Sequence, residues 1–307
     1  MLRRLKAIAR KIGGVLGTND LQRELGAFRA DFQDLRTRSV DSQVTQLLLR
    51  ELYRRQFQEG ALPLPFHEVE FRCHSQNGED GILLYLFAAI GTTNRRAVEI
   101  CAGDGQQCNT ANLILNHGWS ALLFEGDPSL AESARAFYRK HPATFSFPPK
   151  VIETWIVRDT INQTIRDAGF TGEIDLLSLD LDGVDYWIWE AIEVIRPRVV
   201  VAEIQAIWGA ERAVTVPYRD DFQSPLMDGF GIYSGASLPA FVKLAKRKGY
   251  RLVGTQALGF NAFFVRDDIA QDRFPAVTAE AALDVPFVAW ARETYLPRVR
   301  DREWVEV

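Results

Sequence analysis

Acidic side chains end two apolar segments in the second half of this 307-residue chain. Asp180 and Asp182 lie in LSLDLDGVDY, and Glu203 and Gln205 end the run VVVAEIQ. In an extended chain, residues two apart point to the same side, which groups these oxygen atoms in pairs. Carboxylate and amide oxygens bind Mg²⁺, Ca²⁺ or Mn²⁺, and neighbouring carboxylates repel one another unless a cation or a proton joins them. The four residues predict a divalent-cation site or, without a metal, a site that binds loop backbone and substrate hydroxyls.

A glycine-rich turn follows the apolar run at residues 97–100. Gly103 and Gly105 let the backbone approach a ligand closely because they carry no Cβ. The helix expected after this turn supplies free N–H groups at its start. Glu99, near the end of the run, is placed to pair with a ligand's ammonium group, directly or through water. Such a turn occurs in many α/β folds, so it does not name a ligand on its own.

A second acid, Glu125, ends the next apolar run, LLFE. Its distance along the chain from Glu99 is that of one βαβ unit, and a carboxylate at this position can accept both hydroxyls of a ribose. Asp127 serves instead or caps the following helix. The turn and the acid together predict a ligand that contains a nucleoside, either NAD or S-adenosylmethionine (SAM).

From about residue 70 the sequence predicts strands that alternate with helices. These elements would place the candidate side chains. Repeated βα units with apolar strands predict a parallel sheet with helices on both faces. We expect strands at 96–101, 121–125, 151–157, 174–181 and 198–204, and helices at 79–90, 108–117, 186–195 and 238–248. We also expect Asp159 to cap the helix that follows the third strand.

The last two predicted strands, 251–255 and 261–266, are only about five residues apart. So short a connection cannot hold a crossover helix, so these strands must form an antiparallel hairpin. A mostly parallel seven-stranded, Rossmann-like sheet with a reversed last strand is the α/β architecture of class I methyltransferases. It favours SAM over NAD, since dinucleotide-binding folds continue with parallel units.

A polar cluster, CHSQNGEDG at 73–81, precedes a strongly apolar helix. It holds more polar groups than a helix cap requires. His74 is a candidate general base because the ordinary pKa of histidine lies near neutrality. A lone histidine is also often structural, and both interpretations stay open.

The chain divides near residue 62, where Gly60 and two prolines follow a helical region. Residues 1–62 predict a helical extension, and residues 63–307 the α/β domain with a C-terminal tail that packs back on it. The segment 1–16 is predicted to form an amphipathic basic helix that lies on an anionic membrane surface, in solvent or against a partner. The segment 19–59 carries a two-heptad seam that predicts a homo-oligomer or a helix packed on its own domain.

Composition narrows the class of protein further. The formal net charge is −4, which argues against a general nucleic-acid binder. The sequence has neither an apolar run of transmembrane length nor the pattern of a signal peptide. Its three cysteines fit no disulfide scaffold or familiar zinc pattern. We expect a cytoplasmic protein, peripheral at the inner membrane surface if residues 1–16 bind lipid.

Several of these segments resemble the FkbM-like branch of SAM-dependent methyltransferases. The resemblance covers roughly residues 70–266 and rests on SQNGED (75–80), VEICAGDG (98–105), FEGDP (124–128), LSLDLDGVDYWIW (177–189) and GASL (235–238). It implies SAM as methyl donor and usually a hydroxyl acceptor on a sugar or sugar-bearing product. Cys101 stands where the family often has glycine, and Gln205 where related sequences often have asparagine.

The favoured function is therefore O-methylation of a hydroxyl on a carbohydrate or glycosylated metabolite, a small-molecule or glycan acceptor. The catalytic candidates are Asp182 or His74 as base, with Asp180 beside them, and a cation such as Mg²⁺ would orient the hydroxyl. An NAD-dependent oxidoreductase and a non-catalytic interaction protein are the alternatives. The candidate cofactor contacts are Gln76, Glu99, Gly103, Asp104, Gly105, Glu125, Asp127, Asp159 and Asp180.

Overall fold

The computed structural model describes residues 40–227, 229 and 231–307. Contacts divide the chain into two units, Met1–Leu48 and Leu49–Val307, and the division falls within helix α3 (Val40–Gln58). The second unit thus begins before the boundary expected near residue 62. The predicted basic helix at 1–16 and the heptad seam lie outside the described residues. Within the described part of the chain, no helix is both long and apolar enough to cross a membrane.

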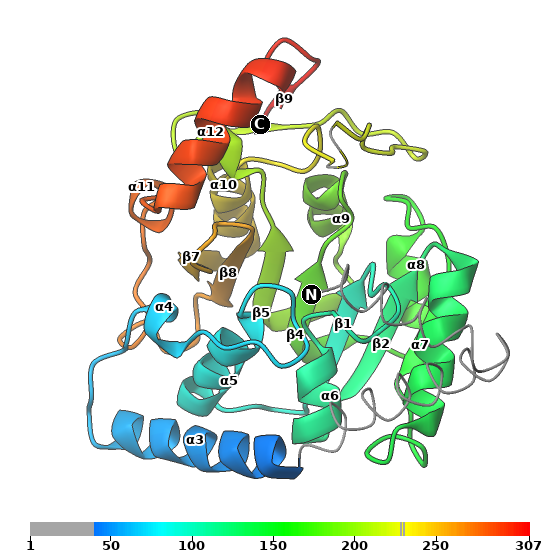
Figure 1. Ribbon diagram of the computed structural model, residues 1–307, viewed down its shortest axis with the longest axis vertical. Helices are drawn as coiled ribbons and strands as arrows, with labels where there is room; N and C mark the ends of the chain where they lie inside the picture. Colours follow the sequence, from blue (N-terminus) through cyan, green and yellow to red (C-terminus); the bar gives the residue numbers. More distant parts are fainter. Residues whose placement is uncertain (1–39, 228, 230) are drawn as a thin grey trace, which may run out of the picture. The chain divides into compact units, whose positions relative to one another are not determined.

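Seven strands of the second unit form one sheet in the order β3-β2-β1-β4-β5-β8-β7 (Figure 1). Strand β8 runs antiparallel to both β5 and β7, and the remaining pairs are parallel. The predicted hairpin and the Rossmann-like seven-stranded fold are therefore confirmed. The reversed strand inserts between β5 and β7. The strands are β1 (Arg96–Ile100), β2 (Ser120–Glu125), β3 (Lys150–Glu153), β4 (Gly172–Leu179), β5 (Ile195–Glu203), β7 (Tyr250–Thr255) and β8 (Asn261–Arg266).

Both faces of the sheet are apolar and covered, because successive residues of a strand point to opposite faces. In β5, Val199 and Val201 pack in one core with residues of α5 and α6, and Val200 and Ala202 pack in another with residues of α8, α9 and α10. The helices that precede the last strands are α4 (Phe66–Val69), α5 (Glu79–Ile90), α6 (Ala111–His117), α7 (Pro128–Lys140), α8 (Ile161–Asp167), α9 (Asp185–Ala191), the 3₁₀ helix η1 (Ala206–Trp208) and α10 (Leu238–Lys248).

The C-terminal segment packs back on the unit, as expected. It contains α11 (Ala279–Ala282), α12 (Pro286–Val299) and β9 (Val305–Glu306), which pairs with β6 (Val214–Thr215). The ring of Trp304 contacts those of Trp208 and Tyr233, at centroid distances of 5.2 Å for each pair. Helix α12 lies against η1, next to the carboxyl end of β5 (Figure 1).

The helix cap predicted at Asp159 is wrong. Helix α8 begins at Ile161, its N-cap is Thr160, and no side chain caps it. Asp159 lies one residue too early to reach the first free N–H groups, and its exposed carboxylate instead pairs with Arg158 at 3.4 Å. Helix α9 is also shorter than predicted, since it ends at Ala191 and leaves room for β5 to begin at Ile195.

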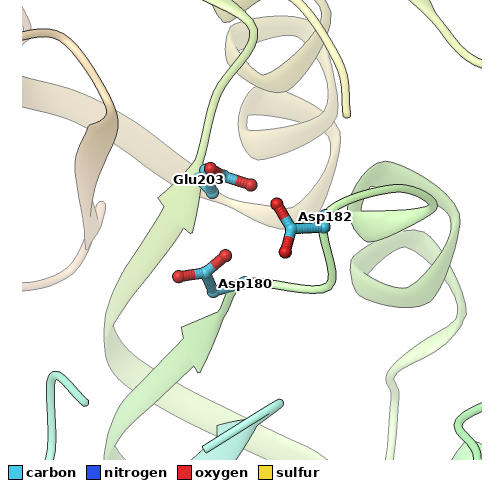
Figure 2. Close-up of side chains that lie close together, drawn as sticks. All are labelled: Asp180, Asp182 and Glu203. Carbon is cyan, nitrogen blue, oxygen red and sulfur yellow. The ribbon is translucent and has the colours of Figure 1, made fainter. Parts of the chain in front are cut away.

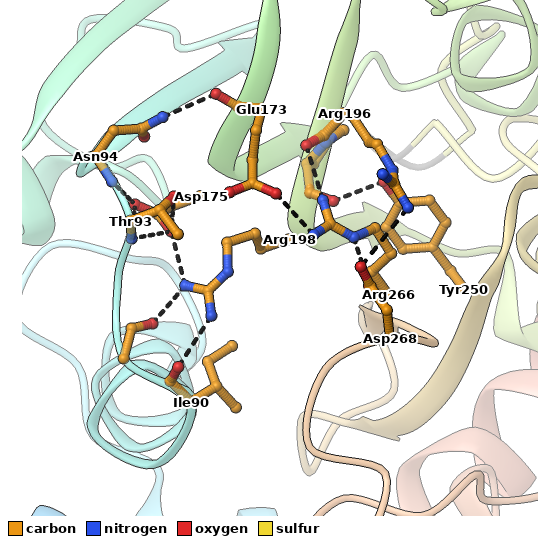
Figure 3. Close-up of polar contacts among 12 residues, drawn as sticks. Ile90, Thr93, Asn94, Glu173, Asp175, Arg196, Arg198, Tyr250, Arg266 and Asp268 are labelled. Carbon is orange, nitrogen blue, oxygen red and sulfur yellow. Dashed lines mark hydrogen bonds and ion pairs between the residues drawn. The ribbon is translucent and has the colours of Figure 1, made fainter.

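A buried ion pair anchors β5 to β4 near the amino ends of these strands (Figure 3). Arg198 donates to the Asp175 carboxylate at 2.9 Å and also to the carbonyl of Ile90. Asp175 additionally accepts the backbone N–H groups of Thr93, Asn94 and Arg95. Burial alone would raise the pKa of Asp175, but these hydrogen bonds outweigh it and lower the pKa below its ordinary value. The ion pair thus holds β4 and β5 together at their amino ends, and the candidate site lies at their carboxyl ends.

Candidate active site

Three cavities lie side by side along the carboxyl edge of the sheet. The main cavity, of about 580 Å³, is lined by predicted site residues Gln76, Glu99, Gly103, Asp104, Asp180 and Glu203, among others. A smaller one of about 110 Å³, here the β2 cavity, contains Glu125, Asp127 and Trp155 and shares Cys101 with the main cavity. A third of about 390 Å³, here the β5 cavity, contains Asp182 and Gln205 and shares Glu203 and Phe260 with the main cavity. Most predicted site residues therefore border one continuous edge, as expected for an open α/β sheet.

Glu125 is held in place by two backbone donors. Its Oε2 accepts the N–H of Gly103 and its Oε1 accepts the N–H of Asp127, each at 2.8 Å. A carboxylate oxygen has two lone pairs, so each oxygen can accept one further hydrogen bond within the β2 cavity. The Asp127 carboxylate caps α7 by accepting the N–H groups of Ser129 and Leu130. Of the two acids, Glu125 is therefore the one suited to a pair of ribose hydroxyls.

Glu99 is engaged by the chain itself. Its Oε1 accepts the N–H of Asn109 at 2.8 Å and the hydroxyl of Ser178 at 3.1 Å. Its Oε2 accepts both the N–H and the hydroxyl of Thr110. A carboxylate has about four acceptor positions, and here all are used. A ligand's ammonium group would have to displace one of these donors. In this structure Glu99 thus joins the start of α6 to β1 and β4.

The turn after β1 relies on three residues with positive φ: Cys101 at 64°, Gly103 at 58° and Gly105 at 73°. A Cβ on Gly105 would lie 2.8 Å from the ring of Tyr138, so this glycine is required by packing against α7. A Cβ on Gly103 would meet nothing within 4 Å. Gly103 borders the main cavity, as does Asp104. Gly105 instead packs against Tyr138 of α7.

The carboxylates of Asp180, Asp182 and Glu203 form one cluster (Figure 2). One oxygen of each lies within 4.8 Å of the others. Asp180 follows β4 directly and Glu203 ends β5, so the parallel pairing of these strands brings the two together. Asp182 lies in the next loop with φ of 52°. Asp185 organises this loop by accepting the N–H groups of Leu181 and Gly183.

Burial and mutual repulsion favour a shared proton in this cluster. Burial, with the negative charges of Asp185 and Asp182, raises the pKa of Asp180 to about 8. Burial and the charge of Asp180 likewise raise the pKa of Glu203 well above its ordinary value, and the two side chains hydrogen-bond to each other. At neutral pH this pair therefore retains a proton in the absence of a cation. Asp182 is the exposed member of the cluster.

Gln205 serves as a donor in this structure. Its Nε2 donates to the carbonyl of Ile232 at 2.8 Å, which ties the segment 231–235 to the end of β5. The backbone N–H of Gln205 also binds the carbonyl of Ala236. Its role as a metal ligand stays a prediction.

The polar cluster at 73–81 divides into two parts. The buried Asp80 accepts the N–H groups of Cys73, His74 and Ser75, and so fixes the loop. Burial raises the pKa of Asp80 to about 6. His74 lies with Nδ1 3.3 Å from the carbonyl of Gln106, and it is not among the described residues that line the three cavities. Gln76 does border the main cavity, so this part of the motif stays a candidate contact.

Asn261 in the main cavity and Trp155 in the β2 cavity are two lining residues that were not singled out from the sequence. Asn261 begins β8 as the register partner of Glu203, and its Nδ2 donates to Oε1 of Glu79 at 2.8 Å. The Oδ1 atom of Asn261 is buried and has no hydrogen-bond partner in the described structure. A polar residue at the start of an otherwise apolar strand was the available signal. Trp155, in the β2 cavity, is likewise a large aromatic side chain left 51% exposed after a strand.

Solved structures with a similar fold include several methyltransferases. The magnesium protoporphyrin IX methyltransferase of Synechocystis PCC 6803, with bound SAM, is 11% identical over 72% of this chain and 96% of its own, with a TM-score of 0.40. An O-methyltransferase from Bacillus cereus in complex with SAH is 14% identical over 86% and 98%, with a TM-score of 0.41. A SAM-dependent methyltransferase from Clostridium acetobutylicum is 9% identical over 70% and 96%, with a TM-score of 0.39. No protein-family model and no curated protein matches the chain.

Proposed function

We propose that this protein is a SAM-dependent O-methyltransferase that acts on a hydroxyl of a carbohydrate or glycosylated metabolite. The observation that carries the proposal is the position of Glu125. Its carboxylate lies at the end of β2, is held by Gly103 and Asp127, and keeps acceptor capacity toward the β2 cavity. The reversed β8 within the sheet and the FkbM-like sequence segments favour SAM as the nucleoside-containing ligand.

The donor fits the residues along the edge of the sheet. Glu125 would accept the ribose hydroxyls, and Trp155 offers an aromatic surface for the base in the same cavity. Gly103, Asp104 and Gln76 border the main cavity, where the amino-acid part would lie. SAM supplies an electrophilic methyl group.

The chain's own task is then to hold the acceptor hydroxyl and remove its proton. Asp182 is the best-placed base among the described residues, because it is exposed in the β5 cavity beside the shared proton of Asp180 and Glu203. As the acceptor oxygen takes the methyl group that bound SAM would supply, Asp182 would accept the hydroxyl proton. His74 contributes to the loop and remains a second candidate.

A divalent cation is the alternative way to neutralise the acidic cluster. Asp180, Asp182 and Glu203 bring one oxygen each to within 4.8 Å of one another, and all-oxygen sites suit Mg²⁺. Such an ion would lower the pKa of the acceptor hydroxyl and orient it. The two versions differ in whether turnover requires the metal.

Calorimetric titration with SAM, S-adenosylhomocysteine and NAD⁺ tests the proposal. We expect both SAM and S-adenosylhomocysteine to bind with micromolar affinity and NAD⁺ to bind far more weakly. Tight binding of NAD⁺ alone would overturn the proposal in favour of an oxidoreductase. Binding of none of the three would favour the non-catalytic alternative.

A further inference from the structure

The β5 cavity differs from the main cavity in the chemistry of its wall. Aromatic side chains form one side: Phe260 from the turn between β7 and β8, and Phe287, Trp290 and Tyr295 from α12. Their rings contact in series, with centroid distances of 5.2 Å for Phe260–Phe287, 5.4 Å for Phe287–Trp290 and 5.5 Å for Trp290–Tyr295. The cavity is therefore lined by a continuous aromatic surface.

The chain itself does not cover this aromatic surface completely. Trp290 remains 49% exposed, whereas Trp208, next to the same helix, is 4% exposed. Leu258, which also lines the cavity, is more than one-third exposed. Large apolar side chains grouped in a concave site are typical of a surface that a ligand covers.

The same cavity also has acidic side chains in its lining. Asp182 and Glu203 both line it, and the described residues of its lining include no lysine or arginine. A ligand in this cavity therefore meets both an apolar aromatic surface and carboxyl groups that can bind a hydroxyl. An anionic ligand would lie beside the Asp182 carboxylate with no cationic side chain in the described lining, and like charges at short range repel.

We infer that the β5 cavity binds the apolar ring portion of an uncharged methyl acceptor and directs its hydroxyl toward Asp182 and Glu203. The acceptor is then a glycoside or similar molecule with an apolar ring group, and neither a free sugar, a sugar phosphate nor a nucleotide sugar. The cavity volume of about 390 Å³ lies within the range of small-molecule sites. This inference rests on the proposed function, whose acceptor class it narrows.

The location of α12 supports this assignment. The residues that supply most of the aromatic wall lie beyond residue 266, outside the segments that carry the family resemblance. A Cβ on Gly259 would lie 2.6 Å from Val288, so the turn between β7 and β8 is fitted closely to α12. The C-terminal segment is thus built into the wall of the cavity, and its aromatic residues are specificity determinants of this chain.

Three probes test the inference on protein saturated with S-adenosylhomocysteine: 2-naphthyl β-glucoside, methyl β-glucoside and 2-naphthyl phosphate. We expect the naphthyl glucoside to bind at least about tenfold more tightly than the methyl glucoside, and the phosphate to show no measurable binding. Trp290→Ala should reduce the preference for the naphthyl group by roughly tenfold, the upper end of a single aromatic contact. Trp290→Phe should restore most of it.

Phe147→Ala is the matched control, because Phe147 is 78% exposed and does not line the described cavities. It should leave the preference unchanged. Equal binding of the two glucosides, or an unchanged preference in Trp290→Ala, would overturn the inference even if S-adenosylhomocysteine binds. Failure of S-adenosylhomocysteine itself to bind would instead count against the proposed function, so the two results are distinguishable.

Discussion

The backbone N–H of Gly103 donates a 2.8 Å hydrogen bond to the Glu125 carboxylate, which ties the turn after β1 to the end of β2. The other oxygen of Glu125 accepts the N–H of Asp127, the residue that caps α7. One buried side chain thus sets the geometry of two segments that border the β2 cavity. Its loss would remove ligand acceptors and loosen the turn together.

Glu125→Ala should therefore weaken SAM binding by about 2–3 kcal/mol, since buried donors and ligand hydroxyls both lose a charged acceptor. Glu125→Gln keeps the shape and one acceptor oxygen, and we expect an intermediate loss. Calorimetry measures both. Glu132→Ala, at a side chain 64% exposed on α7, is the control and should bind SAM like the wild type. Wild-type affinity in Glu125→Ala would remove Glu125 from the proposed site.

Arg198→Leu should lower the free energy of unfolding by about 3 kcal/mol, because it leaves the buried Asp175 charge without its cation (Figure 3). Arg196→Leu is a matched control two residues earlier on β5, where the arginine is 66% exposed and pairs with Asp268 at 3.7 Å. An exposed pair contributes about 0–1 kcal/mol. Urea unfolding of the two variants measures the difference. Equal stabilities would show that the buried pair does not anchor β5.

The sheet was predictable because its signals are local. Apolar runs, their spacing and the five-residue connection before Asn261 indicate the strands and the hairpin without knowledge of distant contacts. The pairing of Asp180 with Glu203 followed from the adjacency of β4 and β5. The sequence could not predict that the chain itself occupies all hydrogen-bond acceptor positions of Glu99, because one of the donors is Ser178 in another strand. The cap at Asp159 failed because spacing locates a helix end only to within a few residues.

Histidine burial predicts a pH effect on stability. Burial, with the positive charges of Arg50 and Arg95, lowers the pKa of His117 from 6.5 to about 4. Between these values the unfolded chain binds more protons than the folded one, so stability rises with pH from about 4 to 6.5 and is lost as pH falls through that window. His117 should account for a change on the order of 2 kcal/mol in the free energy of unfolding across this window, and His117→Asn should remove it.

The measurement is urea unfolding of wild type and His117→Asn at about pH 4.5 and about pH 7. Burial raises the pKa values of Asp80 and Asp185 to about 6, which gives a slope of the opposite sign in the same window. Both proteins share that term, so the difference between them isolates His117. Parallel pH profiles would contradict the assignment.

The N-terminal segment should be dispensable for binding SAM. We propose that the basic residues of 1–16 bind anionic membranes and that the seam from Leu21 to Leu35 joins copies of the chain. A deletion must stop at residue 39, because Tyr53 and Phe57 of α3 contact the ring of Tyr85 at 4.8 and 5.2 Å.

Light scattering and vesicle sedimentation then compare the full chain with the protein lacking 1–39. For the protein lacking 1–39 we expect a smaller oligomer, loss of binding to anionic vesicles and unchanged SAM affinity. Leu25→Glu in the full chain should reduce the size of the oligomer and leave vesicle binding and SAM affinity unchanged. A monomer in every case, without vesicle binding, would leave this segment without either proposed role.

Asp182→Asn should lower kcat strongly and change SAM affinity little. Asp182 is the exposed carboxylate of the acidic cluster and lines the β5 cavity, whereas most of the predicted SAM contacts border the other two cavities. An amide cannot accept the hydroxyl proton, so the loss should fall within the range of about 10²–10⁴ that general-base catalysis contributes. Asp167→Asn, at an exposed side chain that ends α8 and lines none of the three cavities, should retain full turnover. Full activity in Asp182→Asn would transfer the role of base to His74.

Chelation separates the two versions of this site, because they neutralise the same carboxylates differently. If Asp180 and Glu203 share a proton, EDTA should leave turnover unchanged, since no cation takes part. If Mg²⁺ or Mn²⁺ binds Asp180, Asp182 and Glu203, EDTA should abolish turnover and either ion should restore it. In the metal version Glu203→Gln should also raise the concentration of Mg²⁺ needed for half-maximal activity, because one charged ligand becomes neutral. Turnover that EDTA lowers but neither ion restores would fit neither version.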